Sequence, residues 1–301
     1  MRRRLVVLLL GALVLAGCSD SPDTDADARP PAVDTPSTSP TAAPPAYAEY
    51  VALGDSYTAA PLVPPASADN NCLRSGANYP ALVAEAMPGT GLTDVSCSGA
   101  ATVNMTHRQR GISGAVPPQF DALTRRTDLV TIGLGGNDDG LFGALIGQCT
   151  QLRASDPTGD PCTTALGPSV DKSLADIRRN VAEVVAGVRK RAPDARILVV
   201  GYPQIVPARG TCSDLPLADG DYAFAREVNH ALTRAVEKAA ADGKAEYVDL
   251  WAPSARHDIC ARDPWINGRV TTANRALAYH PLAVEQQAVA ALVTAALATN
   301  P

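Results

Sequence analysis

The sequence has no run of five or more lysines and arginines, and its 301 residues carry a formal net charge of −5. Nucleic-acid-binding proteins neutralise phosphates with clustered basic side chains, so this function has no electrostatic support here. The chain also has no C-x-x-C pair, and its four histidines are scattered along it. A zinc site needs several such ligands together. We therefore expect neither a nucleic-acid partner nor a metal.

A hydrophobic segment long enough to cross a membrane is also lacking. The apolar run Leu5–Leu15 has eleven residues, whereas a membrane-spanning helix needs about 20. It follows a basic start, which is typical of a secretory signal. Leu15-Ala16-Gly17-Cys18 resembles the lipobox of bacterial lipoproteins, and this implies that residues 1–17 are removed and that Cys18 is lipidated. The alternative is an ordinary cleaved signal that happens to precede a cysteine.

The segment after the lipobox has a different composition. Residues 18–46 are rich in Ser, Pro, Asp, Thr and Ala and show no apolar periodicity, so we expect a flexible tether. Residues 47–301 have the length of a single domain. The lipobox resemblance then implies an extracytoplasmic lipoprotein, anchored to a membrane of the bacterial cell envelope. We expect the domain to be a monomer.

Besides Cys18, the chain has six cysteines. An even number in an exported chain indicates disulfides, although six cysteines allow fifteen pairings. The short loop between Cys149 and Cys162 contains Pro and Gly and favours pairing of neighbours in sequence. The six are Cys72, Cys97, Cys149, Cys162, Cys212 and Cys260.

Apolar runs of strand length alternate with helical patterns, which indicates an α/β domain with a parallel sheet and helices on both faces. The predicted strands are Tyr50–Leu53, Gly91–Ser96, Asp128–Leu134, Arg196–Val200 and Tyr247–Leu250. The predicted helices are Tyr79–Met87, Ser169–Arg191, Tyr222–Asp242 and Leu282–Ala298. In such sheets, catalytic groups usually lie at the carboxyl ends of the strands.

Gly54-Asp55-Ser56-Tyr57 comes directly after the first predicted strand. The glycine permits a tight turn from strand to helix, and the turn places Ser56 at the carboxyl edge of the sheet. A serine becomes a good nucleophile only when a base takes its proton. A simple turn with a helix-capping serine is the alternative interpretation.

Two further loops follow predicted strands and bring hydrogen-bond donors to the same edge. Gly99 follows the second strand, and Asn137, in Gly135-Gly136-Asn137-Asp138, follows the third. With the backbone N–H of Ser56, their N–H groups would form an oxyanion hole, in which each donor contributes roughly 2.7–4 kcal/mol. Taken singly, each is also compatible with an ordinary loop residue.

A histidine that could serve as the base comes before the last helix, in Tyr279-His280-Pro281. The proline suits a helix start and keeps His280 in the loop. His230 lies within a helical pattern and is expected to be structural. His107 and His257 lie in polar loops and are expected at the surface.

This order of G-D-S, glycine, G-x-N-D and His-Pro resembles the SGNH (GDSL) hydrolases over essentially the whole domain. It is most similar to secreted bacterial lipases and esterases with three disulfides, which also have counterparts of Val116-Pro117-Pro118-Gln119 and Trp265-Ile266-Asn267-Gly268. The resemblance implies a flavodoxin-like three-layer sandwich with a five-stranded parallel sheet. It further implies Ser56 as nucleophile, His280 as base and Ser56, Gly99 and Asn137 as oxyanion hole. The implied disulfides are Cys72–Cys97, Cys149–Cys162 and Cys212–Cys260.

The chain departs from the family pattern at one position. Most members have an aspartate three residues before the histidine, where this chain has Leu277. Some disulfide-bearing members orient the histidine with a backbone carbonyl, and here the carbonyl of Leu277 or Ala278 could serve. We therefore predict a Ser–His dyad, unless Asp249, Asp258 or Asp263 folds back onto the histidine.

The resemblance implies a serine esterase or lipase that cleaves acyl or lipid esters without metal or organic cofactor. The apolar Leu62 and Val63, near the nucleophile, favour such substrates. An acetyl esterase acting on polysaccharide is the alternative within the enzymes. A non-catalytic envelope-binding lipoprotein is the alternative from another class, and a binding protein would have no need for the serine and histidine together.

Overall fold

The computed structural model describes residues 47–65 and 71–299, which contain one sheet of five parallel strands and a two-stranded hairpin. The sheet order is β2-β1-β5-β6-β7, which is the flavodoxin-like order. The prediction of a flavodoxin-like sheet is confirmed. The strands are β1 (Glu49–Gly54), β2 (Gly91–Asp94), β5 (Leu129–Gly133), β6 (Arg196–Val200) and β7 (Glu246–Val248), with the hairpin formed by β3 (Gln109–Arg110) and β4 (Ala115–Val116).

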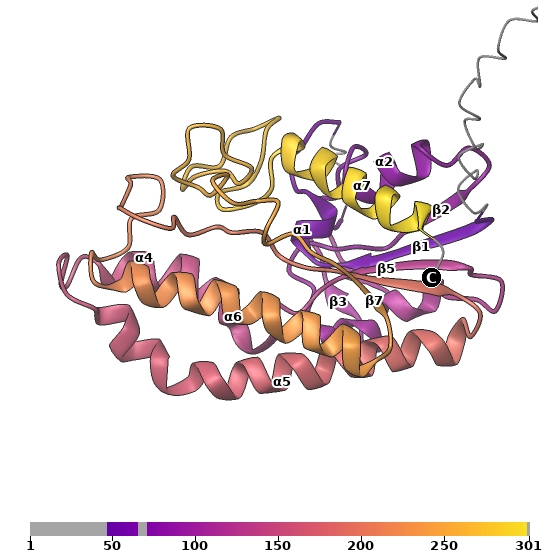
Figure 1. Cartoon of the computed structure of the whole chain (residues 1–301), viewed down its shortest axis with the longest axis horizontal. Helices are drawn as coiled ribbons and strands as arrows, with labels where there is room; N and C mark the ends of the chain where they lie inside the picture. Colours follow the sequence, from indigo (N-terminus) through magenta and orange to yellow (C-terminus); the bar gives the residue numbers. More distant parts are fainter. Residues whose placement is uncertain (1–46, 66–70, 300–301) are drawn as a thin grey trace, which may run out of the picture. The chain divides into compact units, whose positions relative to one another are not determined.

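Helices cover both faces of the sheet (Figure 1). On one face α2 (Tyr79–Glu85) and α7 (Ala283–Ala298) pack on Tyr50 and Ala52 of β1. On the other, α5 (Pro161–Arg191) and α6 (Asp221–Asp242) pack on Val51 and Leu53 of the same strand. Successive side chains of a strand point to opposite faces, so a strand covered on both sides must be apolar throughout. This is why β1, β5 and β6 could be recognised as continuous apolar runs.

Short helical segments connect these layers. They are α1 (Ser56–Ala59), η1 (Thr102–Met105), η2 (Gln119–Ala122), η3 (Asp138–Gly140), α3 (Leu141–Gly143), the π-helical η4 (Ala144–Gln148) and α4 (Cys149–Leu152). The sequence analysis indicated only α1, as the helix after the Gly54 turn, and predicted none of the others. Each is too short to show a full helical period of apolar residues.

The predicted helix Ser169–Arg191 was wrong at its start, because α5 begins at Pro161 and continues through Pro168. A proline inside a helix removes one backbone hydrogen bond. Contacts from elsewhere support the additional turns. The carboxylate of Asp221, at the start of α6, accepts the N–H groups of Cys162 at 2.9 Å and Thr163 at 2.8 Å.

Two predicted strands end two residues earlier than expected: β2 ends at Asp94, and β7 ends at Val248, directly before Asp249. Asp94 accepts the N–H of Ser96 at 2.9 Å, and Asp249 accepts the N–H of Trp251 at 2.8 Å. This local hydrogen bond turns the backbone out of the sheet. The other predicted elements agree with the structure to within two residues at each end.

Three disulfides join Cys72 to Cys97, Cys149 to Cys162 and Cys212 to Cys260. These are the pairs that the family resemblance implied. The first joins the chain after α1 to the chain after β2, and the third joins the segments that follow β6 and β7. The second joins α4 to α5. The loops beyond the carboxyl ends of the strands are thus covalently tied together.

Among residues 47–65 and 71–299, no helix is both long and apolar enough to cross a bilayer. The predicted signal, Cys18 and the tether lie outside the described residues.

Candidate active site

Ser56 is the first residue of α1, directly after the turn that ends β1. Asp55 caps this short helix, because its carboxylate accepts the Tyr57 N–H at 2.8 Å. Gly54 is required by close packing, since a Cβ atom there would lie 2.4 Å from the Cβ of Thr58. The serine is 5 % exposed, so its hydroxyl lies in a largely dehydrated setting.

Gln119 braces the same turn, a role that the sequence analysis did not identify. Its side-chain oxygen accepts the Gly54 N–H at 2.8 Å, and its amide nitrogen donates to the Gly54 carbonyl at 2.9 Å. The side chain is 2 % exposed. It pairs with both the N–H and the carbonyl of Gly54, as the backbone of an adjacent strand would. Gln119 belongs to the quoted Val-Pro-Pro-Gln motif, which was the only sequence signal for it.

The structure brings the loops of Gly99 and Asn137 together. The Asn137 side-chain nitrogen donates to the carbonyl of Ala100 at 2.9 Å, so one of its two hydrogens stays available. Gly99 has a φ of +80°, which favours glycine. Within the described residues, the backbone N–H groups of Ser56 and Gly99 donate to no protein acceptor. These three donors match the composition of an oxyanion hole.

Asp138 fixes the position of this loop pair. Its carboxylate accepts the N–H of Thr102 at 2.8 Å, the hydroxyl of Thr102 at 2.5 Å and the side-chain N–H of Asn180 at 3.1 Å. It therefore ties the end of β5 to η1 and to α5. The aspartate of the G-x-N-D motif is thus structural, while the side-chain amide of the asparagine beside it has one N–H left to donate.

His280 lies beside the turn that carries Ser56, although the two positions are 224 apart in sequence. The Tyr57 hydroxyl donates to the carbonyl of Tyr279 at 2.9 Å, and the Tyr57 and His280 rings lie 5.9 Å apart between centroids. Phe142 of α3 meets the His280 ring edge-on, at 6.2 Å. No hydrogen bond joins Ser56 to His280 among the described residues. Such catalytic bonds often tighten only when substrate binds.

The Nδ1 atom of His280 lies 2.7 Å from the carbonyl oxygen of Ala278, one of the two carbonyls that the sequence analysis named. A carbonyl can only accept, so Nδ1 carries the proton and Nε2 has a free electron pair. Burial of the ring lowers the pKa of His280 below its usual value, and the Ala278 carbonyl partly opposes this. The histidine is therefore neutral near pH 7.

The three aspartates that could have replaced the missing acid have other positions. Asp249 and Asp263 are exposed, and the Asp258 carboxylate accepts the N–H of Cys260 at 2.8 Å. None of them forms a hydrogen bond or an ion pair with His280 in the described chain. His230 and His257 stack on tryptophans, Trp251 and Trp265, and have no contact with Ser56.

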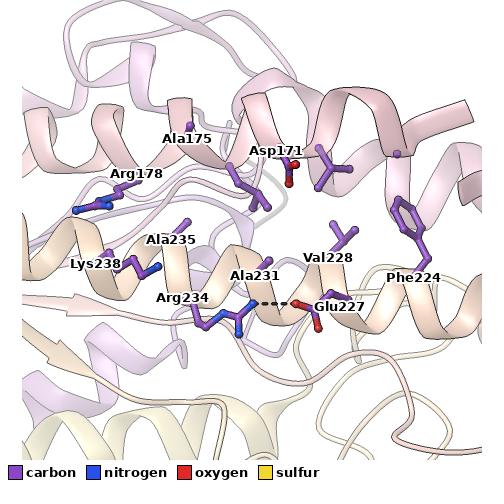
Figure 2. A pocket seen from close by; sticks show the side chains of 13 residues that line it. Asp171, Ala175, Arg178, Phe224, Glu227, Val228, Ala231, Arg234, Ala235 and Lys238 are labelled. Carbon is purple, nitrogen blue, oxygen red and sulfur yellow. Dashed lines mark hydrogen bonds and ion pairs between the residues drawn. The ribbon is translucent and has the colours of Figure 1, made fainter.

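A groove of about 460 Å³ lies elsewhere, between α5 and α6 (Figure 2). Val228 and Phe224 are among its apolar lining residues, and an ion pair of 2.8 Å between Arg234 and Glu227 also lines it. None of the candidate site residues lines it. No group of His, Cys, Asp and Glu side chains suited to a metal ion is found in the described ranges.

Comparison with known proteins agrees with this geometry. Residues 52–295 match the GDSL-like Lipase/Acylhydrolase family. The chain is 43 % identical over 218 residues to Lipase 2 of Streptomyces coelicolor, covering 70 % of this chain and 72 % of that one. The structure resembles phospholipase A1 from Streptomyces albidoflavus NA297, with a TM-score of 0.68 and 28 % identity, covering 84 % of this chain and 100 % of that one. It also resembles an extracellular lipase from Streptomyces rimosus, with a TM-score of 0.67 and 27 % identity, covering 83 % and 99 %. The chain therefore belongs to the GDSL-like lipase/acylhydrolase family and is a carboxylic ester hydrolase.

Proposed function

We propose that this hydrolase uses Ser56 as its nucleophile and His280 as its general base, with no acidic third member. The hydrogen bond from His280 Nδ1 to the Ala278 carbonyl carries the proposal. It selects the tautomer whose Nε2 can take a proton. The bond between Tyr57 and the Tyr279 carbonyl supports placing that nitrogen beside the serine.

In this mechanism, Nε2 of His280 takes the hydroxyl proton of Ser56 as the oxygen attacks the ester carbonyl. The N–H groups of Ser56, Gly99 and Asn137 stabilise the oxyanion that forms. The imidazolium then gives its proton to the alcohol, which leaves. Water repeats the sequence on the acyl-enzyme and releases the acid.

The carbonyl of Ala278 orients the ring but has no formal charge with which to stabilise the imidazolium. Burial also lowers the pKa of His280, because it disfavours the charged form. With a lowered pKa, His280 is unprotonated at neutral pH and can accept a proton. Its surroundings, however, stabilise the imidazolium form only weakly. Catalysis must therefore depend strongly on geometry and on the three oxyanion donors.

We further propose that the substrates are acyl or lipid esters. The aromatic ring of Phe142 is half-buried and adjoins His280, so a leaving group or acyl chain there would meet an apolar wall. Val63, near the nucleophile turn, is fully buried and contributes to the apolar surroundings. The names of the relatives, a lipase and a phospholipase A1, point to the same substrate class.

The test is a series of p-nitrophenyl esters from acetate to palmitate, assayed beside acetylated sugars. We expect turnover of esters, its loss in Ser56→Ala and His280→Ala, and wild-type rates in Ser169→Ala, which changes an exposed serine of α5. Fluorophosphonate should label the wild type and not Ser56→Ala. More than a few per cent of activity in Ser56→Ala would contradict the nucleophile assignment. A clear preference for acetylated sugars would identify a carbohydrate esterase instead.

The site of action that we propose is outside the cytoplasm. Three disulfides in a chain of this size are typical of exported proteins. We propose that residues 1–17 are a lipoprotein signal, that Cys18 carries the lipid, and that residues 18–46 tether the domain of residues 47–301. An acyl pair or triple on Cys18 would suffice for stable anchoring, whereas a single chain would not.

A further inference from the structure

A buried hydroxyl connects the ends of three strands beside the candidate site. Tyr202 follows β6 and is 3 % exposed. Its hydroxyl donates to Oδ2 of Asp55 at 2.5 Å and accepts the N–H of Gly136 at 2.8 Å. Asp55 follows β1 and directly precedes Ser56, and Gly136 follows β5 and directly precedes Asn137. One phenol group therefore touches the neighbours of both the nucleophile and an oxyanion donor.

The surroundings leave this tyrosine little freedom. Thr233 of α6 donates its hydroxyl to the Tyr202 carbonyl at 3.1 Å. The ring meets that of Tyr57 edge-on at 5.6 Å, and Tyr57 in turn bonds the chain beside His280. A Cβ atom at Gly136 would lie 3.2 Å from the Tyr202 hydroxyl, so a side chain there would press against the hydroxyl.

Asp55 has a hydrogen bond on each carboxylate oxygen, from the Tyr57 N–H and from Tyr202. The two bonds fix the plane of the carboxylate and with it the first turn of α1. The pKa of Asp55 is raised to about 7, chiefly by burial and in smaller part by the charge of Asp138, while the hydrogen bonds from Tyr202 and Tyr57 oppose the rise. The donors match an ionised carboxylate, because Tyr202 already accepts from Gly136 and has its proton to give.

We propose that Tyr202 is a positioning residue, which holds Ser56 and Asn137 in register by binding Asp55 and Gly136 at once. The inference builds on the proposed roles of Ser56 and Asn137. Tyr202 itself does not touch substrate. Its effect is geometric, and misplacement of reacting groups by about 1 Å can cost 10²-fold in rate.

The test compares Tyr202→Phe with Tyr50→Phe. Tyr50 is a matched control, since it also loses a buried hydroxyl with a hydrogen bond, to Thr131 at 2.8 Å, but packs on the opposite face of the sheet. We expect Tyr202→Phe to lose about 10- to 100-fold in kcat, with KM changed less than about threefold, and Tyr50→Phe to keep wild-type kcat. Active sites are counted with fluorophosphonate, so that misfolded protein does not lower the apparent kcat. Wild-type kcat per active site in Tyr202→Phe would overturn the proposal.

A pH profile separates positioning from general stability. Activity should fall as Asp55 becomes protonated, and without the Tyr202 donor the ionised carboxylate is less stable, so its pKa rises. The acid limb of kcat/KM should thus move to higher pH in Tyr202→Phe and not in Tyr50→Phe. The titratable groups that interact with Asp55 are Tyr57, Tyr79, Asp138 and Tyr202. Of these, only Tyr202 is changed in the variant. An unmoved limb would overturn the proposal.

If Tyr202→Phe does not fold, Asp55→Asn probes the other end of the same bond. It keeps an acceptor for the Tyr57 N–H and removes the charge, and we expect a comparable loss of kcat. Wild-type kcat in Asp55→Asn would contradict the inference. Ser56→Ala tests the proposed function separately, because activity in that variant would contradict it. If Ser56→Ala is inactive and Tyr202→Phe has wild-type kcat, only the positioning role of Tyr202 is contradicted.

Discussion

The carboxylate of Asp258 accepts the backbone N–H of Cys260 at 2.8 Å, and this bond caps a turn beside the Cys212–Cys260 disulfide. The best-buried acid among those that could have completed a triad is thus occupied by its own backbone. His280 is oriented instead by the carbonyl of Ala278, two residues before it.

Replacing the candidate acids should therefore cost little. We predict that Asp258→Asn and Asp263→Asn each keep at least a tenth of wild-type kcat/KM, because neither carboxylate reaches His280. The amide replacement of a true triad aspartate can cost about 10⁴-fold, since it favours the wrong tautomer. Steady-state kinetics on a soluble ester measure the difference. A folded variant that loses three or more orders of magnitude would identify that aspartate as a triad member.

Asn137 should prove less essential than Ser56. Asn137→Ala removes one of three oxyanion donors, and the loss of one such donor typically costs about 10²–10³ in kcat. Two backbone donors remain, so we expect measurable residual turnover and little change in KM. Asn180→Ala is a suitable control, because Asn180 contacts the same loop through Asp138 but offers no donor to the site. Equal losses in the two variants would mean that Asn137 acts only by supporting the loop.

The buried carboxyl group of Glu285 should make the stability of the fold depend on pH. It is 1 % exposed, and burial raises its pKa to about 8, although Gln286 donates to its carboxylate at 2.6 Å. The folded state therefore holds a proton that the unfolded state releases near its ordinary pKa. The stabilisation is complete below the unfolded pKa and is lost as pH rises through about 8. Glu285→Gln removes this proton exchange, so its Tm relative to wild type should rise between pH 5 and 8. The exposed Glu183→Gln serves as control, and parallel Tm curves for wild type and Glu285→Gln would contradict the prediction.

The disulfides should contribute unequally to stability. Cys212 and Cys260 close a loop with a sequence separation of 48, and Cys149 and Cys162 one of 13. From loop-closure entropy, removing the disulfide of the longer loop should lower the free energy of unfolding by about 4 kcal/mol, and removing that of the shorter loop by about 3 kcal/mol. Urea unfolding of the paired alanine variants measures both. A larger loss at Cys149–Cys162 would show that the disulfide acts mainly on the folded state, through the start of α5.

Lipidation at Cys18 can be tested on the exported protein. We expect it to fractionate with membranes, and its mature N-terminus to begin at Cys18 and carry acyl mass. Cys18→Ser should release the protein or block its processing, while the purified domain keeps its activity because Cys18 is outside residues 47–301. A wholly soluble wild-type protein without acyl mass would rule out the anchor.

The sequence by itself determined the α/β architecture and the four candidate site residues. β1, β5 and β6 are covered on both faces, so their burial requires an unbroken apolar run, and Arg196–Val200 could be delimited without any tertiary information. Ser56, Gly99 and Asn137 each follow a strand, and the carboxyl ends of parallel strands meet at one edge. Their proximity could therefore be predicted from position alone.

Only the tertiary structure decided how these residues are held. The start of α5 depends on the carboxylate of Asp221, which is 59 residues away from Cys162, and no local pattern signals that contact. The choice between the Leu277 and Ala278 carbonyls depends on the backbone path, including a φ of +62° at Tyr279. Tyr202 and Gln119 contact the nucleophile turn from 147 and 65 residues away. Their roles arise from hydrogen bonds between distant segments, and such bonds leave no periodicity in the sequence.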